Sequence, residues 1–310
     1  ATDGNGVHFL SHKDQQVTRR FYHDVNDKEG IRSNSIYSLL IDDRGAVWVG
    51  HFQAGLDYSL YQNGLFRTYD YPPLFNSANL SIRSFVNKGQ EKVIGSRDGL
   101  FYINEATGVV KSFVKPVLTS DLILTICFYQ GEYYIGTYGG GMMVLNPETL
   151  SLKYFAQGDT ELFQKGHIFC VKPDAKGNLW IGTSQGLFSY NGQTKQIKSF
   201  TSANSQLPEG NVYEVSFDST GKGWIATETG MCIYDPASQS LRSNVFPEGF
   251  VNKDKVRTIY EDAEHNLYFI REKGSLFTST LTMDRFQNRS IFSTLPDNSL
   301  MSVIEDNQDR

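Results

Sequence analysis

The chain has 310 residues, of which 39% are hydrophobic, and it carries a formal net charge of −5 at pH 7. Acidic and basic residues are interspersed without a basic stripe, which argues against a general nucleic-acid-binding surface. No apolar run approaches the length that a membrane-spanning helix needs, which excludes such a helix within these residues.

A short motif recurs along the chain at a nearly constant spacing. Aligned on the residue that follows Trp-Ile, its copies place Gly50, Gly95, Gly136, Gly182, Ala226 and Ile270 at equivalent positions, 41 to 46 residues apart. In chain order they read GAVWVGHFQAGLDYS, GQEKVIGSRDGLFYI, GEYYIGTYGGGMMVL, GNLWIGTSQGLFSY, GKGWIATETGMCIYD and HNLYFIREKGSLFTS. Such a period is typical of propeller blades with four strands each.

The copy that begins at residue 211 shows what each unit is expected to form. NVYEVSFD alternates as a strand does, and GWIAT, MCIYD and LRSNVF follow as three further short strands. The segments STGK, ETG and PASQS between them have the composition of tight turns. Four antiparallel strands cannot bury both faces of their sheet alone, whereas radial stacking of such sheets buries them.

The two ends of the chain read as halves of one more unit. ATDGNGVHFL resembles the second half of a copy, and MSVIEDNQDR resembles the first half. With six interior copies, this predicts an all-β, seven-bladed propeller of four-stranded antiparallel blades, whose last blade is shared between the N- and C-terminal ends. Its outer strands would be GVHFL and TRRFYHD, and SLMSVIED would be an inner strand that closes the ring. Residues 1–310 are thus predicted to form a single domain, cut from a longer multi-domain chain.

Within the motif, a structural role is favoured over a phosphate-binding one. Gly177 and Gly186 are predicted turn glycines, Gly182 a strand glycine that allows close packing, and Trp180 a core residue between blades. A phosphate-binding glycine loop needs a helix after it, and no window shows sustained helical periodicity.

Cysteine and histidine usage gives no sign of a metal site. The apolar strand runs around Cys127, Cys170 and Cys232 predict buried free thiols. No CxxC or Cys/His spacing indicates a metal, and His8 and His12 do not share a helix face. We therefore expect no metal and no cofactor.

The form of the repeat is specific: D-x-x-G-x-L-W-I-G-T, then x-x-G-L, an aromatic residue and a strand. It resembles the two-component regulator propeller repeat, most closely in DAKGNLWIGTSQGLFSY (174–190) and DDRGAVWVGHFQAGLDY (42–58), followed by DSTGKGWIATETGMCIY (218–234). FVNKGQEKVIG and CFYQGEYYIG lack the Asp and the Trp, and EDAEHNLYFIRE loses the glycines. The resemblance covers essentially the whole chain.

Such repeats form the periplasmic sensor region of hybrid two-component histidine kinases of Bacteroidetes. The resemblance implies a parent membrane protein with two propellers, an immunoglobulin-like module, a kinase core, a receiver and an AraC-type DNA-binding region. It implies an oligosaccharide ligand derived from glycans, regulation of polysaccharide-utilisation genes, and contacts with the neighbouring propeller, the immunoglobulin-like module and a homodimer partner. These residues carry no kinase, receiver or DNA-binding motif, so this segment is expected to be no enzyme and to bind no nucleic acid.

Propeller geometry predicts the face on which a ligand would bind. The D-x-x-G turns lie on one face, and the loops after Gly-Thr lie on the other, together with the connections into the next blade. Side chains of these loops vary while the repeat around them is constant, which indicates specificity. The candidate ligand-binding residues are Tyr37, His51, Gln53, Arg83, Arg97, Asp98, Tyr138, Gln185, Tyr213, Glu228, Arg257 and Arg271.

The first positions of the innermost strands give a predicted ring around the channel: Tyr37, Arg83, Leu124, Phe169, Tyr213, Arg257 and Met301. Three aromatic residues and two arginines suit a sugar ring or an acidic sugar. The alternative, that these side chains plug a dry channel, remains open. The loops 71–81, 156–167 and 246–255 carry apolar residues that predict contacts with a dimer partner or a second propeller, or packing on the propeller's own rim.

Two other classes of function remain open. One is a stand-alone protein-interaction propeller. The other is a carbohydrate-active hydrolase or lyase, which would need paired carboxylates at a fixed separation, or His and Glu around a metal. Asp98, Glu214, Glu228 and Glu272 are the carboxylates predicted on the channel face, and His51 and His167 would accompany them in a lyase. No spacing singles out a pair.

Overall fold

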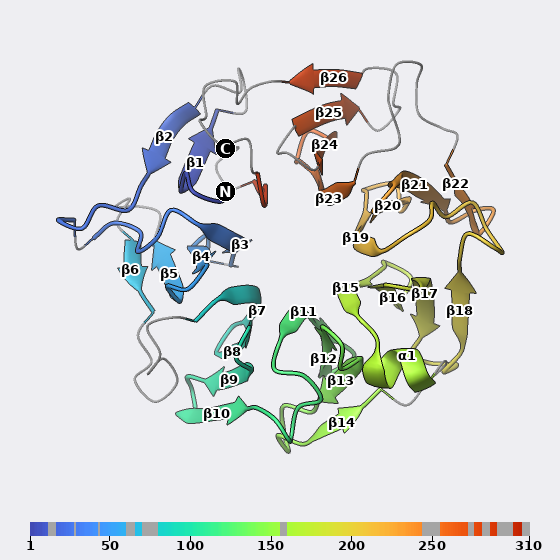
Figure 1. The fold of residues 1–310 in the computed structure, drawn as a ribbon, viewed down its shortest axis with the longest axis horizontal. Coiled ribbons are helices and arrows are strands. Elements are labelled where there is room, and N and C mark those ends of the chain that lie inside the picture. Colours follow the sequence, from blue (N-terminus) through green and yellow to red (C-terminus); the bar gives the residue numbers. More distant parts are fainter. Residues whose placement is uncertain are drawn as a thin grey trace.

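The inner strands of six antiparallel sheets surround a common centre in the computed structural model (Figure 1). It describes residues 1–11, 17–27, 29–42, 44–59, 66–69, 80–155, 160–243, 255–271, 276–280, 286–289 and 300–305. Each of the six sheets has four strands, and a further sheet has two. Within each four-stranded sheet the chain runs outward, strand by strand, before it enters the next blade.

The strands of equivalent position have similar lengths in all six blades. The inner strands are β3 (Ile36–Ile41), β7 (Ile82–Lys88), β11 (Ile123–Tyr129), β15 (Ile168–Pro173), β19 (Val212–Phe217) and β23 (Val256–Glu261). The second strands are β4 (Val47–His51), β8 (Glu91–Ser96), β12 (Glu132–Thr137), β16 (Asn178–Thr183), β20 (Gly223–Thr227) and β24 (Asn266–Arg271).

The outer half of each blade is completed by two more strands. The third strands are β5 (Leu56–Ser59), β9 (Leu100–Asn104), β13 (Met142–Leu145), β17 (Gly186–Asn191), β21 (Gly230–Asp235) and β25 (Leu276–Thr280). The outermost are β6 (Phe66–Thr68), β10 (Val109–Phe113), β14 (Leu152–Tyr154), β18 (Ile197–Phe200), β22 (Ser240–Arg242) and β26 (Phe286–Arg289).

The prediction of seven four-stranded blades is wrong, because the described residues form six. Between the last and first blades lies a two-stranded sheet, in which β1 (Val7–Leu10) pairs with β2 (Val17–Phe21). The predicted inner strand makes one isolated bridge, from Leu300 to Thr2, and residues 301–305 form no strand. The physical reason is that a partner strand is missing. In each four-stranded blade the second strand pairs with both the inner and the third strand, and the described residues contain six such second strands.

Segment 300–305 nevertheless contacts the last blade in the way that one inner strand contacts another. Thr258 Oγ1 donates to the carbonyl of Met301 at 3.5 Å, as Ser38 Oγ donates to the carbonyl of Ile82 at 3.3 Å between the first two blades. The Met301 N–H donates to the carbonyl of Ala1 at 3.1 Å. The N-terminal residues therefore meet segment 300–305, although the two build no four-stranded sheet.

The Asp and Trp of the repeat form one hydrogen-bonded unit. Asp174 accepts the indole N–H of Trp180 at 2.9 Å with one carboxylate oxygen, and with the other it accepts two backbone N–H groups of its own turn. The Asp42 and Asp218 carboxylates bond Trp48 and Trp224 in the same way. Trp180 is buried, and its ring lies 4.5 Å from that of Tyr234 in the next blade, which confirms its place in the core.

The residue after Trp-Ile lies where the next blade comes nearest. A Cβ added to Gly136 would lie 2.7 Å from Cγ2 of Ile168, and one added to Gly182 would lie 2.8 Å from the carbonyl of Val212. Ile168 and Val212 are the first residues of the next inner strands. This confirms Gly182 as a strand glycine that permits close packing between blades, while Gly186, at φ 129°, lies in the left-handed region expected of a turn glycine.

One predicted loop contains a short helix that no periodicity indicated. The helix α1 (Thr160–Lys165) precedes β15, and its Leu162 and Phe163 are buried in the core cluster of the third and fourth blades. This part of the loop 156–167 therefore packs on its own propeller, and the apolar pair is not exposed for a partner. Residues 71–79 and 246–254 of the other two loops lie outside the described residues.

All three cysteines are free and buried, as predicted. Burial raises the pKa of the Cys127 thiol to about 11, and it raises the pKa values of Cys170 and Cys232 as well. The thiols are therefore protonated and unreactive at neutral pH.

Replacing Asp174 with Ala is expected to lower the free energy of unfolding by about 1–3 kcal/mol, because the Trp180 indole N–H loses its acceptor inside the structure. Urea unfolding followed by Trp fluorescence measures the change. Glu148→Ala, at an exposed turn position, is the control and should change stability by less than about 0.5 kcal/mol. Equal stability of the two variants would contradict a structural role for the Asp–Trp pair.

Candidate functional site

Each of the six inner strands carries a β-bulge at its second residue. In β15, Ile168 pairs with Thr183 and Cys170 pairs with Gly182, so Phe169 is an extra residue without a partner in the ladder. The same shift recurs in the other five inner strands. The extra residues, which we call the bulge ring, are Tyr37, Arg83, Leu124, Phe169, Tyr213 and Arg257. Because a bulge re-aims a side chain, six side chains of four types are presented at the same end of the inner strands.

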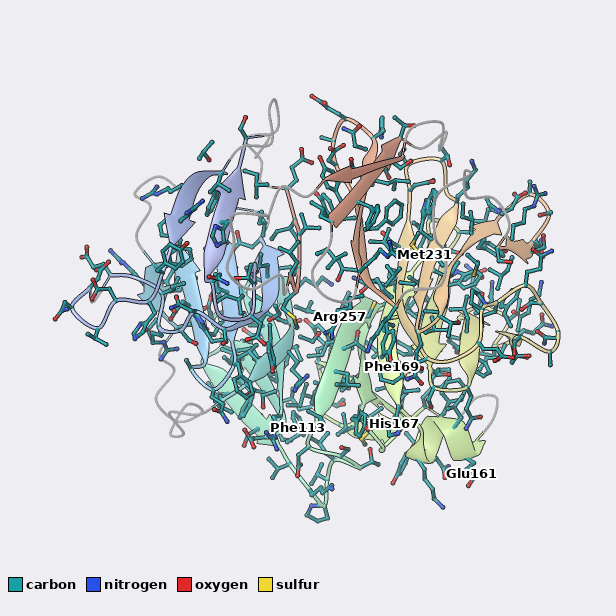
Figure 2. All side chains as sticks on the ribbon, turned by 45° about the horizontal axis from the view of Figure 1, so that its top comes forward. Phe113, Glu161, His167, Phe169, Met231 and Arg257 are labelled. Atoms are coloured by element: carbon teal, nitrogen blue, oxygen red, sulfur yellow. The ribbon has the colours of Figure 1, made fainter. Side chains whose placement is uncertain are left out.

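The bulge ring is accessible to solvent. Arg257 is exposed, and the other five members are partly exposed. Figure 2 shows Arg257 and Phe169 near the centre of the ring of blades, whereas Glu161 of α1 lies at its edge. The ring contains four of the predicted site residues, Tyr37, Arg83, Tyr213 and Arg257. Met301, the seventh predicted member, lies in segment 300–305, where there is no ladder and hence no bulge.

A backbone hydrogen bond ties each bulge to the neighbouring loop. The N–H of Tyr138 donates to the carbonyl of Leu122 at 3.0 Å, and the N–H of Glu228 donates to that of Asn211 at 2.9 Å. Equivalent bonds occur in three other blades. In these five blades the loop after the second strand is therefore fixed beside the residue that lies two positions before the bulge. This arrangement places the predicted loop residues beside the bulge ring. Six of them are exposed there: Gln53, Arg97, Asp98, Tyr138, Gln185 and Glu228.

Four aromatic rings from three consecutive blades form a row, which we call the aromatic arc: Tyr138, His167, Phe169 and Tyr213. Their centroid separations along the row are 4.0, 6.2 and 5.1 Å. The Tyr138 side chain is 50% exposed although its ring stacks on His167. A row of partly exposed ring faces offers apolar surface to the flat face of a cyclic ligand.

Cations lie against aromatic rings at two places around the centre. The guanidinium carbon of Arg83 is 5.0 Å from the ring centroid of Tyr37, which in turn contacts Phe52. Lys255 Nζ is 4.5 Å from the centroid of Tyr213, at the end of the aromatic arc. Such contacts hold a cation near an aromatic surface without neutralising its charge.

His51 and Arg271 end the second strands β4 and β24, and both are buried. His51 Nε2 lies 2.8 Å from Oδ2 of Asp57, whose other oxygen accepts from Nε of Arg32 at 2.9 Å. In the aligned copies Thr183 occupies the place of His51 and is buried too, its hydroxyl bonded to a turn carbonyl. The Arg271 guanidinium packs over the ring of Phe277, and burial lowers its pKa. Both side chains therefore hold their own blades together, beneath the exposed loop residues.

Fixed spacing could have revealed residues that the sequence analysis missed. Lys255 and Asn211 both lie two positions before a bulged residue, as His167 does. Asn211 Nδ2 donates to the hydroxyl of Tyr213 at 3.1 Å, so it orients one ring of the aromatic arc. Once the ring positions are aligned, this constant offset identifies Lys255 and Asn211 as neighbours of the site.

Two of the carboxylates predicted on the channel face, Glu214 and Glu228, have partners of their own in the described part of the chain. Glu214 lies 3.6 Å from Lys172 Nζ, and Glu228 accepts the N–H of Asn211 at 3.2 Å. Coulombic attraction to Glu214 raises the pKa of Lys172, whereas burial raises that of Glu214, and the direct contact keeps the two as an ion pair between neighbouring inner strands. Glu272 lies outside the described residues.

A Ser–His–Glu cluster occurs at the turns that join the first and second strands, away from the bulge ring. Ser219 Oγ and Glu261 Oε1 both lie near the same nitrogen of His265, at 3.1 and 2.7 Å. A nucleophilic triad instead uses the two different ring nitrogens. Glu261 also accepts the N–H of Ser219, so the cluster fastens the last blade to the one before it.

Neither metal binding nor membrane crossing is indicated by the described residues. Within those ranges no group of three or more His, Cys, Asp or Glu side chains is arranged to hold a metal ion. The helical structure found there lacks the length and apolarity to span a bilayer.

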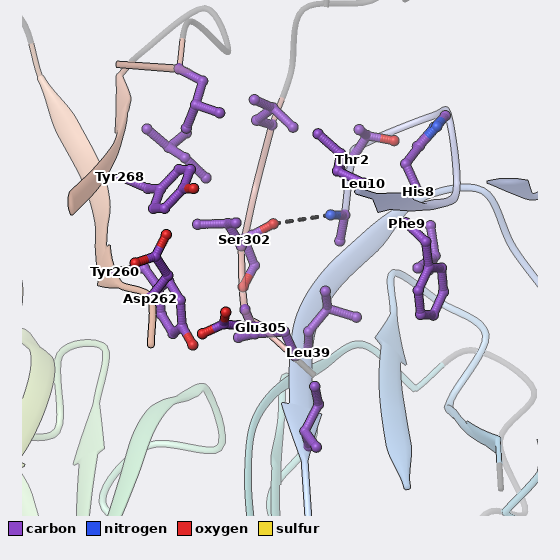
Figure 3. A pocket seen from close by; sticks show the side chains of 18 of the residues that line it. Thr2, His8, Phe9, Leu10, Leu39, Tyr260, Asp262, Tyr268, Ser302 and Glu305 are labelled. Atoms are coloured by element: carbon purple, nitrogen blue, oxygen red, sulfur yellow. Dashed lines mark hydrogen bonds between the residues drawn. The ribbon is translucent and has the colours of Figure 1, made fainter. Parts of the chain in front are cut away.

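An apolar cavity of about 120 Å³ lies where the N-terminal residues meet segment 300–305, between the last and first blades (Figure 3). Leu39, Ile270, Leu300 and Val303 contribute to its wall, and the N-terminal amine donates to the carbonyl of Ser302 beside it at 3.0 Å. Its lining is mainly aliphatic, whereas the bulge ring combines aromatic side chains with arginines. The bulge ring is therefore the better candidate for a polar, cyclic ligand.

Comparison with known proteins bears on the repeat itself. The family model described as "Two component regulator propeller" matches residues 30–53 and 163–185. The chain contains two-component regulator propeller repeats. Both matches include motif copies on which the resemblance was based, those around Trp48 and Trp180. No curated protein matches the chain.

Solved structures show the same fold. The extracellular domain of a Bacteroides thetaiotaomicron protein described as a hybrid two component system, BT3049, is 21% identical, with a TM-score of 0.68 over 89% of this chain and 42% of that one. A second such domain, BT4673, is 16% identical, with a TM-score of 0.66 over 90% and 40%. PorZ, a surface component of the type-IX secretion system of Porphyromonas gingivalis, is 13% identical, with a TM-score of 0.69 over 90% and 45%. The chain thus spans less than half of each of these structures.

Different roles are expected for the two histidines near the candidate site. His51→Ala should lower the free energy of unfolding by about 2–4 kcal/mol, because it removes a buried bond to a carboxylate. His167→Ala should cost about 1 kcal/mol or less, because that side chain is partly exposed. Urea unfolding of both variants measures the difference. A larger loss for His167→Ala would contradict the assignment of His51 to the interior.

Proposed function

We propose that this propeller is the ligand-sensing part of an extracytoplasmic sensor region and binds glycan-derived oligosaccharides at the bulge ring. The observation that carries the proposal is the repeated bulge: six inner strands of one repeating design present side chains of four types, Tyr, Arg, Leu and Phe, at one end of the centre. Packing between blades explains the constant positions of the repeat, but it does not explain which residues occupy the six bulged positions. Ligand recognition gives them a reason to differ.

The comparisons support the sensor context of this proposal. The repeats are two-component regulator propeller repeats, and two similar structures are extracellular domains of proteins described as hybrid two component systems. We further propose that the chain lies in the periplasm, as part of a parent histidine kinase that regulates polysaccharide-utilisation genes. The neighbouring propeller, an immunoglobulin-like module and a second copy of the receptor are its proposed partners.

The inner strands support transmission of the signal as a rigid body. Ser84, directly after a bulged residue, accepts the N–H of Ile126 in the next inner strand at 2.9 Å. The corresponding Ser38 donates across the first blade boundary at 3.3 Å. A ring whose inner strands are bonded to one another favours motion of the whole propeller over rearrangement within it. A ligand on the aromatic arc would contact the third, fourth and fifth blades together.

A matched pair of exposed tyrosines tests the proposal. Tyr138, on the aromatic arc, is 50% exposed, and Tyr154, on the outer strand β14, is 49% exposed. Oligosaccharides from plant and host glycans are screened for a rise in melting temperature, and the binders are titrated by calorimetry. Tyr138→Ala should weaken binding about tenfold through loss of a stacking surface, whereas Tyr154→Ala should leave it unchanged.

Two results would contradict the proposed function. One is a screen in which no oligosaccharide binds, which would favour a protein-interaction propeller. The other is equal binding by the two tyrosine variants, which would place the sugar site away from the aromatic arc.

A further inference from the structure

Arg83 is a charged member of the bulge ring without a counter-ion. Its guanidinium rests on the ring of Tyr37, and the described part of the chain gives it no ion pair. Its Nε is enclosed and has no hydrogen-bond partner. An enclosed donor of a charged group is costly to leave unpaired, so an anionic ligand group at this position would stabilise the structure.

The rest of the bulge ring has the same electrostatic character. Its six side chains are three aromatic, two arginine and one leucine, and none is acidic. Lys255 adds a further cation against Tyr213. The chain as a whole carries a net charge of −5, whereas the six ring residues carry two positive charges and no negative one. The cations of the ring favour an anion at the centre, and the exposed carboxylates of Asp98 and Glu228 lie beside the ring in the neighbouring loops.

We infer that the bulge ring selects an acidic oligosaccharide and that Arg83 binds the carboxylate or sulfate of one of its sugars. This inference rests on the proposed oligosaccharide-sensing function. A guanidinium is planar and presents paired N–H groups that match two oxygens of a carboxylate or sulfate. An acidic sugar carries such a group beside its ring, and the site combines cations with aromatic rings, because Arg83 lies over Tyr37 and Lys255 lies over Tyr213.

Calorimetric titration of the 310-residue chain with defined tetrasaccharides tests this inference. The acidic probes are a galacturonic-acid tetrasaccharide and a sulfated, heparin-derived tetrasaccharide, and the neutral probes are cellotetraose and maltotetraose, together with the binders found by the screen above. At least one acidic ligand should bind about 10- to 100-fold more tightly than every neutral one. Its affinity should fall as salt rises from 50 to 500 mM. Binding of the galacturonic-acid probe shows that carboxylates suffice, whereas binding of the heparin-derived probe alone, which carries both groups, indicates that sulfate is required.

Arg83→Gln should weaken binding of the acidic ligand about 10- to 100-fold, and Arg83→Lys should weaken it less, because charge remains but the paired donors are lost. The matched control is Lys111→Gln, which removes a cation that lies 5.0 Å from the ring of Phe113 on an outer strand. It should leave binding unchanged. Melting temperatures without ligand establish that each variant is folded, and Arg83→Lys remains informative if Arg83→Gln is not.

The failure of this inference differs from failure of the proposed function. If neutral oligosaccharides bind as tightly as acidic ones, or if folded Arg83 variants bind the acidic ligand as the unmodified chain does, the inference is overturned and the proposed function stands. If no oligosaccharide binds, both are overturned.

Discussion

The close approach of neighbouring blades, at the residue that follows Trp-Ile, is the constraint on which the rest of the structure depends. At this point the first residue of the next inner strand, such as Ile168 or Val212, would contact any added side chain. The same position pairs with the residue just after the bulge, as Gly182 does with Cys170. Where a complete blade follows, a small residue is thus needed there, both for packing between blades and beside the point where the ladder shifts by one residue. In the last blade Ile270 occupies the position and packs against Leu300.

The repeat therefore has positions that recur from blade to blade because of packing, and one position, at the bulge, that varies. The Asp–Trp hydrogen bond, the small residue and the serine bonds between inner strands recur and are explained by packing. The bulged residue makes no ladder pair, so sheet formation leaves its side chain unspecified. The fold can therefore carry any side chain at six places around its centre without loss of the propeller. Recognition of a ligand is the function that we propose for such a design.

Much of the blade could be predicted from sequence, because its determinants are local. The strands, the turn glycines and the buried Trp180 follow from alternation and turn composition within one repeat. The ring positions were also predictable, since aligned repeats place Tyr37, Phe169 and Tyr213 at the same offset. The bulge itself was not, because it is a property of pairing register, which a single strand does not reveal. The burial of His51 was foreseeable from its alignment with Thr183, whose hydroxyl closes a turn.

The number of blades could not be derived by counting half-copies. A half-copy has the sequence pattern of a strand, but a strand forms only where a neighbouring strand completes its ladder, and residues 301–305 pair with no strand in the described part of the chain. The helix α1 was missed for a similar reason. Its six residues are too few for a periodic pattern, and it is held by burial of Leu162 and Phe163 against neighbouring blades.

The most direct test of the central claim is hydroxyl-radical footprinting of the chain with and without a saturating oligosaccharide that raises its melting temperature. The account predicts protection of Tyr138, Phe169 and Tyr213, with no change at Tyr154 on the outer strand. Protection confined to residues outside the bulge ring and the aromatic arc would contradict it.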